Sequence, residues 1–413
     1  MPRPAVKLGT RPEGIRFEAL PPLSLYVHIP WCVRKCPYCD FNSHELKDSA
    51  HLGPIPSVSG GHKALANDVE RNYIAALVAD LESALPSIWG RKVYTIFFGG
   101  GTPSLLSARA IDEILGAIRA RLPIAPDAEI TLEANPGTFE VAKFAGYRAA
   151  GVNRLSIGIQ SFNREHLKAI GRVHDHIEAR RAIEIAQANF DNINLDLMYG
   201  LPNQTLDEAG ADIETAAAFG TSHISSYHLT IEPNTYFHRY PPSLPDHDIS
   251  ADMQQMVEET LGARGFDHYE TSAFALPGLQ CRHNLNYWRF GDYVGVGAGA
   301  HGKISFPDRV VRELRAKHPR EYLDAVVQGR QVQDTHVVSP AELPFEFMMN
   351  ALRLTDGFSL RLFEERTGLP LAAALPGLSA AEAGGLITRD HKHATPTPTG
   401  RRFLNEMLEI FLP

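Results

Sequence analysis

The 413-residue sequence contains only four cysteines, which fits a reducing compartment and argues against a disulfide framework. It has no apolar run near the roughly 20 residues that cross a bilayer. Charged side chains interrupt its first 20 residues, which is unlike a secretory signal. The formal net charge of −8 offers no broad basic surface, so nucleic acid is a poor candidate partner. We therefore expect a cytoplasmic protein, and peripheral membrane contact stays open.

Three of the four cysteines lie close together, as Cys32, Cys36 and Cys39. Their spacing is C-x3-C-x2-C, and an aromatic residue, Tyr38, precedes the last of them. Three thiolates can hold three irons of a 4Fe–4S cluster, which normally takes four, and then one iron is open to a non-protein ligand. The alternative is zinc, with His28 or His44 as a further ligand. The short spacing favours the cluster, with chemistry at the open iron.

Short apolar runs alternate with amphipathic stretches over the first two thirds of the chain. The runs predict strands at Ser24–Ile29, Val93–Phe98, Ala128–Glu133, Asn153–Ile159, Ile193–Met198 and Ser222–Leu229. The amphipathic stretches predict helices at Asn72–Ala84, Ala108–Arg121, Phe139–Ala150, Ile177–Ala188 and Leu206–Ala218. Repeated strand–helix units imply parallel strands with crossover helices. Functional residues are then expected at the carboxyl ends of the strands.

The pattern changes to mainly helical after about residue 308. Helices are predicted at Pro340–Leu354, Leu360–Thr367, Ala380–Leu386 and Gly400–Leu412, with a small hairpin, or wing, of Ile387–Asp390 and Ala394–Thr397. This divides the chain into an extension (1–21), a large α/β domain (22–307) and a helical domain (308–413). The Gly-, Pro- and Ser-containing segment Asp48–Asn67 reads as an insertion or a lid.

Several predicted strands end in residues suited to a polar ligand. The triplet Gly99–Gly101 lets a ligand approach the backbone, and Thr102 follows it. The carboxylates of Glu133 and Asp196 can accept hydrogen bonds from an ammonium group or a ribose, and the amide of Gln160 can pair with a ribose diol. The guanidinium of Arg172 can bind a carboxylate in a bidentate pair. Each residue also has a structural reading, such as a helix cap for Glu133.

The cysteine motif resembles that of the radical S-adenosylmethionine (radical SAM) superfamily. The resemblance implies an incomplete (β/α)6 barrel, a 4Fe–4S cluster on Cys32, Cys36 and Cys39, and SAM chelated to the open iron. By the same resemblance, the residues that contact SAM are Tyr26, Tyr38, Gly100, Gly101, Thr102, Glu133, Gln160, Arg172 and Asp196.

The wider motif set is similar to the HemW heme-chaperone family. It includes Tyr-Val-His-Ile-Pro-Trp-Cys, Gly-Gly-Gly-Thr-Pro-Ser, Glu-Ala-Asn-Pro-Gly and His-Asn-Leu-Asn-Tyr-Trp. This resemblance covers roughly residues 22–410. It implies heme as bound cargo, with His283 as the candidate ligand, and apo-proteins such as respiratory enzymes as recipients, at the membrane or elsewhere. Cys281 is an alternative thiolate ligand, and a homodimer stays open.

The related family of oxygen-independent coproporphyrinogen III dehydrogenases, HemN, is the alternative. Those enzymes continue the motif to a fourth cysteine, where this chain has Phe41, and they have a longer segment before it. Both differences favour HemW. Whether the radical SAM machinery turns over a substrate stays open. The alternative functions are radical decarboxylation of coproporphyrinogen III propionates in heme biosynthesis and radical chemistry on another substrate.

Overall fold

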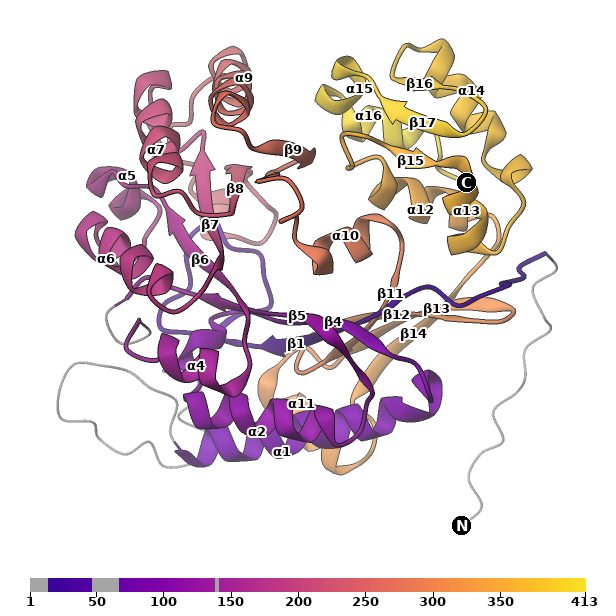
Figure 1. Ribbon diagram of the computed structural model, residues 1–413, viewed down its shortest axis with the longest axis horizontal. Helices are drawn as coiled ribbons and strands as arrows, with labels where there is room; N and C mark the ends of the chain where they lie inside the picture. The colour runs from indigo at the N-terminus through magenta and orange to yellow at the C-terminus, as the bar shows by residue number, and fades with distance from the viewer. Residues whose placement is uncertain (1–13, 47–66, 138–140) are drawn as a thin grey trace.

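The computed structural model describes residues 14–46, 67–137 and 141–413. The described residues form a 12-stranded sheet in the order β14-β13-β12-β11-β1-β4-β5-β6-β7-β8-β10-β9. Helices cover its outer face, and a separate C-terminal unit lies beside it (Figure 1). The predicted lid, apart from Asn67, lies outside the described residues, as do the first two residues, 139 and 140, of a predicted helix.

The centre of the sheet is parallel, from β11 through β1 to β8. The six predicted strands are confirmed with small changes at their ends: β1 (Leu23–Ile29), β4 (Val93–Gly100), β5 (Ile124–Ala134), β6 (Arg154–Gln160), β7 (Asn192–Tyr199) and β8 (His223–His228). Most of their residues are buried, whichever face of the sheet they point to, as in parallel sheets that are covered on both faces. The predicted α/β fold with a parallel sheet is confirmed.

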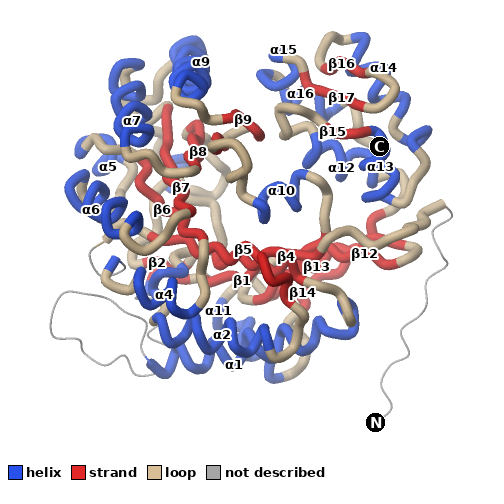
Figure 2. The backbone as a smooth tube through the Cα atoms, viewed as in Figure 1, coloured by secondary structure: helices blue, strands red, loops and turns tan. Residues whose placement is uncertain are grey.

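Antiparallel strands extend both edges of this parallel centre. They are β9 (Asp267–Glu270) and β10 (Ala273–Ala275) at one edge, and β12 (His301–Phe306), β13 (Arg309–Arg315) and β14 (Val332–Val338) beyond β11 (Asp292–Val296) at the other. The sheet forms an arc, and α10 (Arg282–Trp288) lies on its concave side (Figure 2). The concave face of this arc is where the site is built.

Helices alternate with the strands as predicted. Those of the α/β part are α1 (Asn67–Ile88), α2 (Ala108–Arg119), α4 (Phe144–Ala150), α5 (Arg164–Ala169), α6 (His176–Gln187), α7 (Leu206–Ala218), α8 (Tyr236–Arg239), α9 (His247–Ala263) and α11 (Pro319–Val327). Local chemistry fixes their starts: Thr205 and Glu208 form a capping box at α7, and the Ser107 hydroxyl accepts a hydrogen bond from the Ala110 amide at α2.

The change to mainly helical structure comes after β14, later than the predicted residue 308. The predicted boundary falls between β12 and β13, which pair in one sheet. β14 was missed because most of its side chains are exposed, so it lacks apolar alternation. Its place in the sheet comes from backbone pairing with β13 instead.

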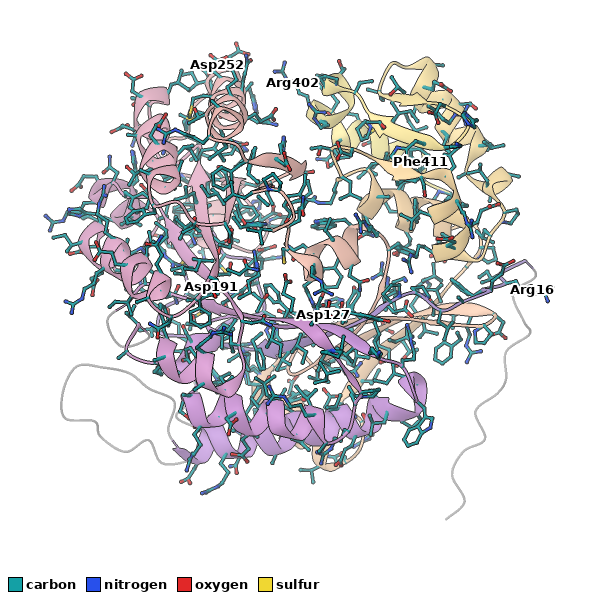
Figure 3. The ribbon with its side chains drawn as sticks, in the orientation of Figure 1. Arg16, Asp127, Asp191, Asp252, Arg402 and Phe411 are labelled. Carbon is teal, nitrogen blue, oxygen red and sulfur yellow. The ribbon has the colours of Figure 1, made fainter. Side chains whose placement is uncertain are left out.

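The C-terminal unit has its own apolar core. It contains α12 (Leu343–Ala351), α13 (Leu360–Thr367), α14 (Leu375–Ala383), α15 (Pro398–Arg402) and α16 (Leu404–Glu409), with β15 (Phe358–Ser359), β16 (Ile387–Arg389) and β17 (His393–Pro396). The predicted wing is present and gains a third strand, β15. The predicted last helix is two short helices, because Phe403 takes a non-helical backbone (φ −110°, ψ 45°). Phe411 then lies within this unit (Figure 3).

The N-terminal segment joins this unit to the sheet. The Arg16 amide donates to the Gly368 carbonyl at 2.8 Å, and the Phe17 amide donates to the Pro307 carbonyl at 3.2 Å. Ile15 is buried in the C-terminal core. Within the described ranges, every helix is too short or too polar to cross a membrane.

Candidate functional site

The three clustered cysteines lie on a loop that leaves the carboxyl end of β1. A short parallel pair, β2 (Trp31–Cys32) and β3 (His44–Glu45), closes this loop. Inside it, the Cys39 amide donates to the Cys36 carbonyl at 3.2 Å. The Lys35 ammonium donates to the carbonyls of Phe41 (3.1 Å) and Ser43 (3.2 Å). Backbone and side-chain contacts within the loop therefore determine its shape.

The loop presents three free, partly exposed thiols. Burial raises the pKa of Cys32 to about 11 and also raises the pKa of Cys39. The thiols have polar neighbours at hydrogen-bond distance: the Thr102 hydroxyl for Cys32 (3.4 Å), the Arg172 guanidinium for Cys36 (3.7 Å) and the Ser43 hydroxyl for Cys39 (3.8 Å). Ser43 also contacts Cys32, and the Tyr38 hydroxyl contacts Cys36. In the described part of the chain, no three His, Cys, Asp or Glu side chains are placed so that they could hold one metal ion.

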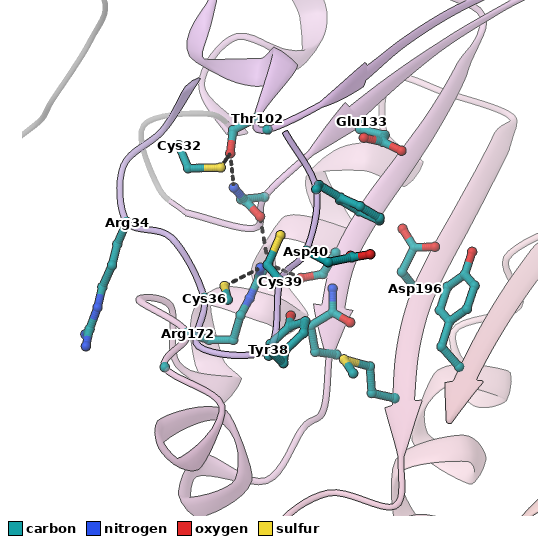
Figure 4. A pocket seen from close by; sticks show the side chains of 18 of the residues that line it. Cys32, Arg34, Cys36, Tyr38, Cys39, Asp40, Thr102, Glu133, Arg172 and Asp196 are labelled. Carbon is teal, nitrogen blue, oxygen red and sulfur yellow. Dashed lines mark hydrogen bonds between the residues drawn. The ribbon is translucent and has the colours of Figure 1, made fainter. Parts of the chain in front are cut away.

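A cavity of about 420 Å³ opens beside these thiols, at the carboxyl ends of β4 to β8 (Figure 4). Eight of the nine residues predicted to contact SAM line it together with the three cysteines: Tyr38, Gly100, Gly101, Thr102, Glu133, Gln160, Arg172 and Asp196. Tyr26 does not line it. The sequence therefore brings one loop and the ends of successive strands to a single concave surface.

The glycines at the end of β4 are required by close packing against β1 and the cysteine loop. A Cβ on Gly100, whose φ is +113°, would come within 2.6 Å of the His28 ring. A Cβ on Gly101 would come within 2.6 Å of the Trp31 carbonyl oxygen. The Gly101 amide also donates to the Ile29 carbonyl at 2.7 Å. These glycines both line the cavity and let the loop lie directly against β4.

Two carboxyl groups lie at the inner end of the cavity. Burial, and next the nearby Asp196, raise the pKa of Glu133 to about 8. Burial also raises the pKa of Asp196, although its carboxylate accepts hydrogen bonds from Ser156 (2.9 Å) and Asn194 (2.8 Å). A cationic ligand between these two groups would stabilise their ionised forms.

Arg172 and Gln160 complete the cavity on the side of β6. One Arg172 nitrogen donates to the Asn135 side-chain oxygen (2.7 Å) and to the Gly158 carbonyl (2.6 Å). Its Nε is buried and has no hydrogen-bond partner among the described residues. Gln160 holds a positive φ of 69°, which is uncommon for a residue other than glycine. An open guanidinium donor is the feature that a carboxylate ligand would satisfy.

Tyr26 instead lines a smaller chamber of about 200 Å³ deeper in the arc. The two spaces share Glu133, Ser156, Asp196 and Tyr227 in their walls. The Tyr26 hydroxyl lies 3.1 Å from His28 Nδ1. Tyr26 thus lines a chamber that adjoins the cavity beside the thiols and shares Glu133 with it.

His283 also lines this deeper chamber, and both of its ring nitrogens are engaged. Nδ1 lies 2.7 Å from the Thr95 hydroxyl, and Nε2 lies 3.0 Å from the Tyr287 hydroxyl. The side chain is 1% exposed, and burial lowers its pKa to about 3. In this conformation His283 anchors α10 to the sheet and offers no free nitrogen to iron. The alternative ligand, Cys281, is fully buried.

Sequence reasoning missed several residues of these walls. Asn135, Tyr227 and Thr230 line the cavity, and Arg154 and Asn194 line the deeper chamber. A period of two, counted back along β6 and β7 from Gln160 and Asp196, would have indicated the inward-facing members. Asn135 lies just beyond a strand, where strand periodicity gives no signal.

Two family models match the chain. The Radical SAM superfamily model matches residues 26–216. The HemN C-terminal domain model matches residues 338–403, which begins at the end of β14. Among solved structures, the fold is similar to that of coproporphyrinogen III oxidase (HemN) from Escherichia coli, with a TM-score of 0.77, 23% identity, and coverage of 95% of this chain and 90% of that one. At that identity the likeness concerns the fold alone.

Curated relatives are more similar in sequence. The heme chaperone HemW of Escherichia coli strain K12 is 49% identical over 395 residues, which cover 95% of this chain and 99% of the relative. The heme chaperone HemW of Bacillus subtilis strain 168 is 35% identical over 397 residues, with 94% and 99% covered. Both matches therefore cover nearly the whole chain and nearly the whole of each relative. The chain therefore belongs to the radical SAM superfamily and, within it, to the HemW family.

Proposed function

We propose that this protein is a cytoplasmic heme chaperone of the radical SAM type, which binds a 4Fe–4S cluster, SAM and heme and delivers heme to apo-proteins such as respiratory enzymes. The observation that carries the cofactor part is the single cavity shared by three free thiols and polar strand ends. The printed names of the curated relatives support the heme part.

The residues fit the two cofactors. Cys32, Cys36 and Cys39 would bind three irons, and the adjoining cavity leaves room for a ligand on the fourth. The buried, unpartnered Nε of Arg172 suits the carboxylate of SAM. Glu133 and Asp196 suit its cationic groups or its ribose. When bound, the cluster would supply one-electron reduction at SAM.

The pKa of Glu133 predicts a pH dependence of SAM binding. With a pKa of about 8, this carboxyl is mostly protonated at neutral pH and becomes an anion as the pH rises through that value. If it faces a cationic group of SAM, the ratio of wild-type to Glu133→Gln affinity should rise about tenfold between about pH 7 and pH 9. Equilibrium dialysis without reductant measures both affinities, and the ratio cancels titration of SAM itself. A ratio that does not change with pH would remove Glu133 from the SAM contacts.

Heme ligation by His283 would require a hydrogen bond within α10 to break. Because Nε2 faces the Tyr287 hydroxyl, iron can reach this nitrogen only after that contact opens. We expect His283→Ala to alter the Soret band in a hemin titration, and Tyr287→Phe, which removes the competing hydroxyl, to bind hemin severalfold more tightly. If neither variant changes the titration, the ligand lies elsewhere on the chain.

The fold likeness to HemN keeps porphyrinogen decarboxylation as the second candidate. Against it, Phe41 stands where the dehydrogenase motif has its fourth cysteine, and this side chain is 62% exposed at the rim of the cavity. Reconstituted protein, SAM, reductant and coproporphyrinogen III separate the candidates. We expect the porphyrinogen to stay unchanged, and stoichiometric formation of protoporphyrinogen would favour the enzyme.

A further inference from the structure

Asn135 follows the end of β5 and joins two residues that contact cysteine thiols. Its Nδ2 donates to the Thr102 hydroxyl oxygen at 3.1 Å, and its Oδ1 accepts from Arg172 at 2.7 Å. A guanidinium can only donate hydrogen bonds. The amide oxygen must therefore face Arg172 and the amide nitrogen must face Thr102, so the orientation of the amide is fixed by its partners.

This orientation directs a donor at each of two thiols. Since the Thr102 oxygen accepts from Asn135, its own hydroxyl proton is free to reach Cys32 Sγ at 3.4 Å. The other terminal nitrogen of Arg172 donates to Cys36 Sγ at 3.7 Å. Figure 4 shows the continuous chain of contacts from Thr102 to Arg172 beside the thiols. One amide thus connects the environments of Cys32 and Cys36.

The third thiol, that of Cys39, has a hydroxyl neighbour that does not depend on Asn135. The Ser43 hydroxyl lies 3.8 Å from Cys39 Sγ and belongs to the cysteine loop itself. No hydrogen bond within the described residues connects Ser43 to Asn135. The chain thus contains its own reference: the Thr102 and Arg172 contacts to sulfur depend on Asn135, and the Ser43 contacts to Cys39 and Cys32 do not.

We propose that Asn135 is a positioning residue that raises the reduction potential of the cluster by aiming Thr102 and Arg172 at two of its sulfur ligands. This inference rests on the proposed binding of a 4Fe–4S cluster by the three cysteines. Hydrogen bonds to the sulfurs stabilise the more negative, reduced cluster and so raise its potential. Asn135 acts through its two neighbours rather than on the cluster directly.

The test is a redox titration of reconstituted protein without SAM, followed by the spectrum of the reduced cluster. Asn135→Ala should lower the equilibrium constant for reduction about tenfold, which is about 59 mV for one electron. Thr102→Val should lower the midpoint in the wild-type background but add no further shift in the Asn135→Ala background. Ser43→Ala should shift the midpoint equally in both backgrounds.

Asn153→Ala is the matched control for the loss of a hydrogen-bonded asparagine. The Asn153 side-chain oxygen accepts from the Ile130 backbone amide (2.7 Å), and its side-chain nitrogen donates to the Ala128 carbonyl (2.8 Å). Both contacts lie away from the thiols, so the midpoint potential should not move. If the Asn135→Ala variant does not retain its iron, the same redox titration is made on Asn135→Asp. Its carboxylate accepts from the Thr102 hydroxyl and turns that proton away from Cys32, so Thr102→Val should again add no shift.

Cluster binding and the role of Asn135 are contradicted by different results. A wild-type protein that takes up no 4Fe–4S cluster would contradict the proposed function. A wild-type protein that binds the cluster, with an Asn135→Ala variant of equal iron content and equal midpoint, would overturn this inference alone. The same holds if Thr102→Val shifts the midpoint equally with and without Asn135.

Discussion

Replacing any one of Cys32, Cys36 or Cys39 with serine should abolish the brown 4Fe–4S absorbance of the reconstituted protein. The loop offers three thiolates to the proposed cluster, so each substitution leaves only two. A serine hydroxyl is far harder to deprotonate and is a poor ligand for iron of this kind. The measurement is iron content together with visible absorbance after anaerobic reconstitution.

Cys281→Ser is the matched control. Cys281 is fully buried beside α10, and its thiol contacts the Glu129 carboxylate at 3.6 Å. It lines neither the cavity beside the cysteine loop nor the deeper chamber. We expect this variant to keep the full cluster. Loss of iron in Cys281→Ser, or its retention in a loop variant, would contradict the assignment of ligands.

Asp292→Asn should cost about 3–5 kcal/mol of the free energy of unfolding, because it leaves buried cations without their counter-ion. The Asp292 carboxylate, fully buried at the start of β11, contacts Lys303 (2.9 Å) and Arg91 (2.8 Å). It also accepts from the Ser305 amide (2.9 Å) and hydroxyl (2.8 Å). Although burial alone would raise it, these two cations hold the pKa of Asp292 below its ordinary value. Urea denaturation of the apo-protein measures the loss.

Glu365→Gln provides the comparison for an ion pair in water. Glu365 contacts Arg361 at 2.7 Å on α13, where both side chains are exposed. Such pairs contribute about 0–1 kcal/mol, so this variant should unfold almost like the wild type. A loss below about 1 kcal/mol for Asp292→Asn would show that the buried cations find water or other partners.

Much of the α/β part could be predicted because its signals are local. The helix at Leu206–Ala218 matches its prediction at both ends, since a capping box and helical spacing determine it. Edge strands were missed where pairing is made by backbone groups and side chains face water, as in β14. The break at Phe403 also left no signal in the sequence, since its backbone angles depend on tertiary packing.

Some features of the candidate site could also be predicted from the sequence, and others could not. Motif residues at strand ends came together in one cavity, because the carboxyl ends of parallel strands meet at one edge. The direction of a side chain is a different matter. Tyr26 faces the deeper chamber, and both nitrogens of His283 are held by Thr95 and Tyr287. The His283–Tyr287 contact joins residues four apart on α10, but the Thr95 contact joins distant parts of the chain and cannot be read from spacing, and neither could the role of Asn135.

Transfer of heme tests the central claim most directly. Hemin-loaded protein is mixed with the apo-form of a heme-containing respiratory enzyme, the two are separated, and the Soret absorbance of the acceptor is followed with time. We expect the acceptor to gain heme faster from the loaded protein than from free hemin at the same concentration. An acceptor that gains heme no faster than from free hemin would contradict it.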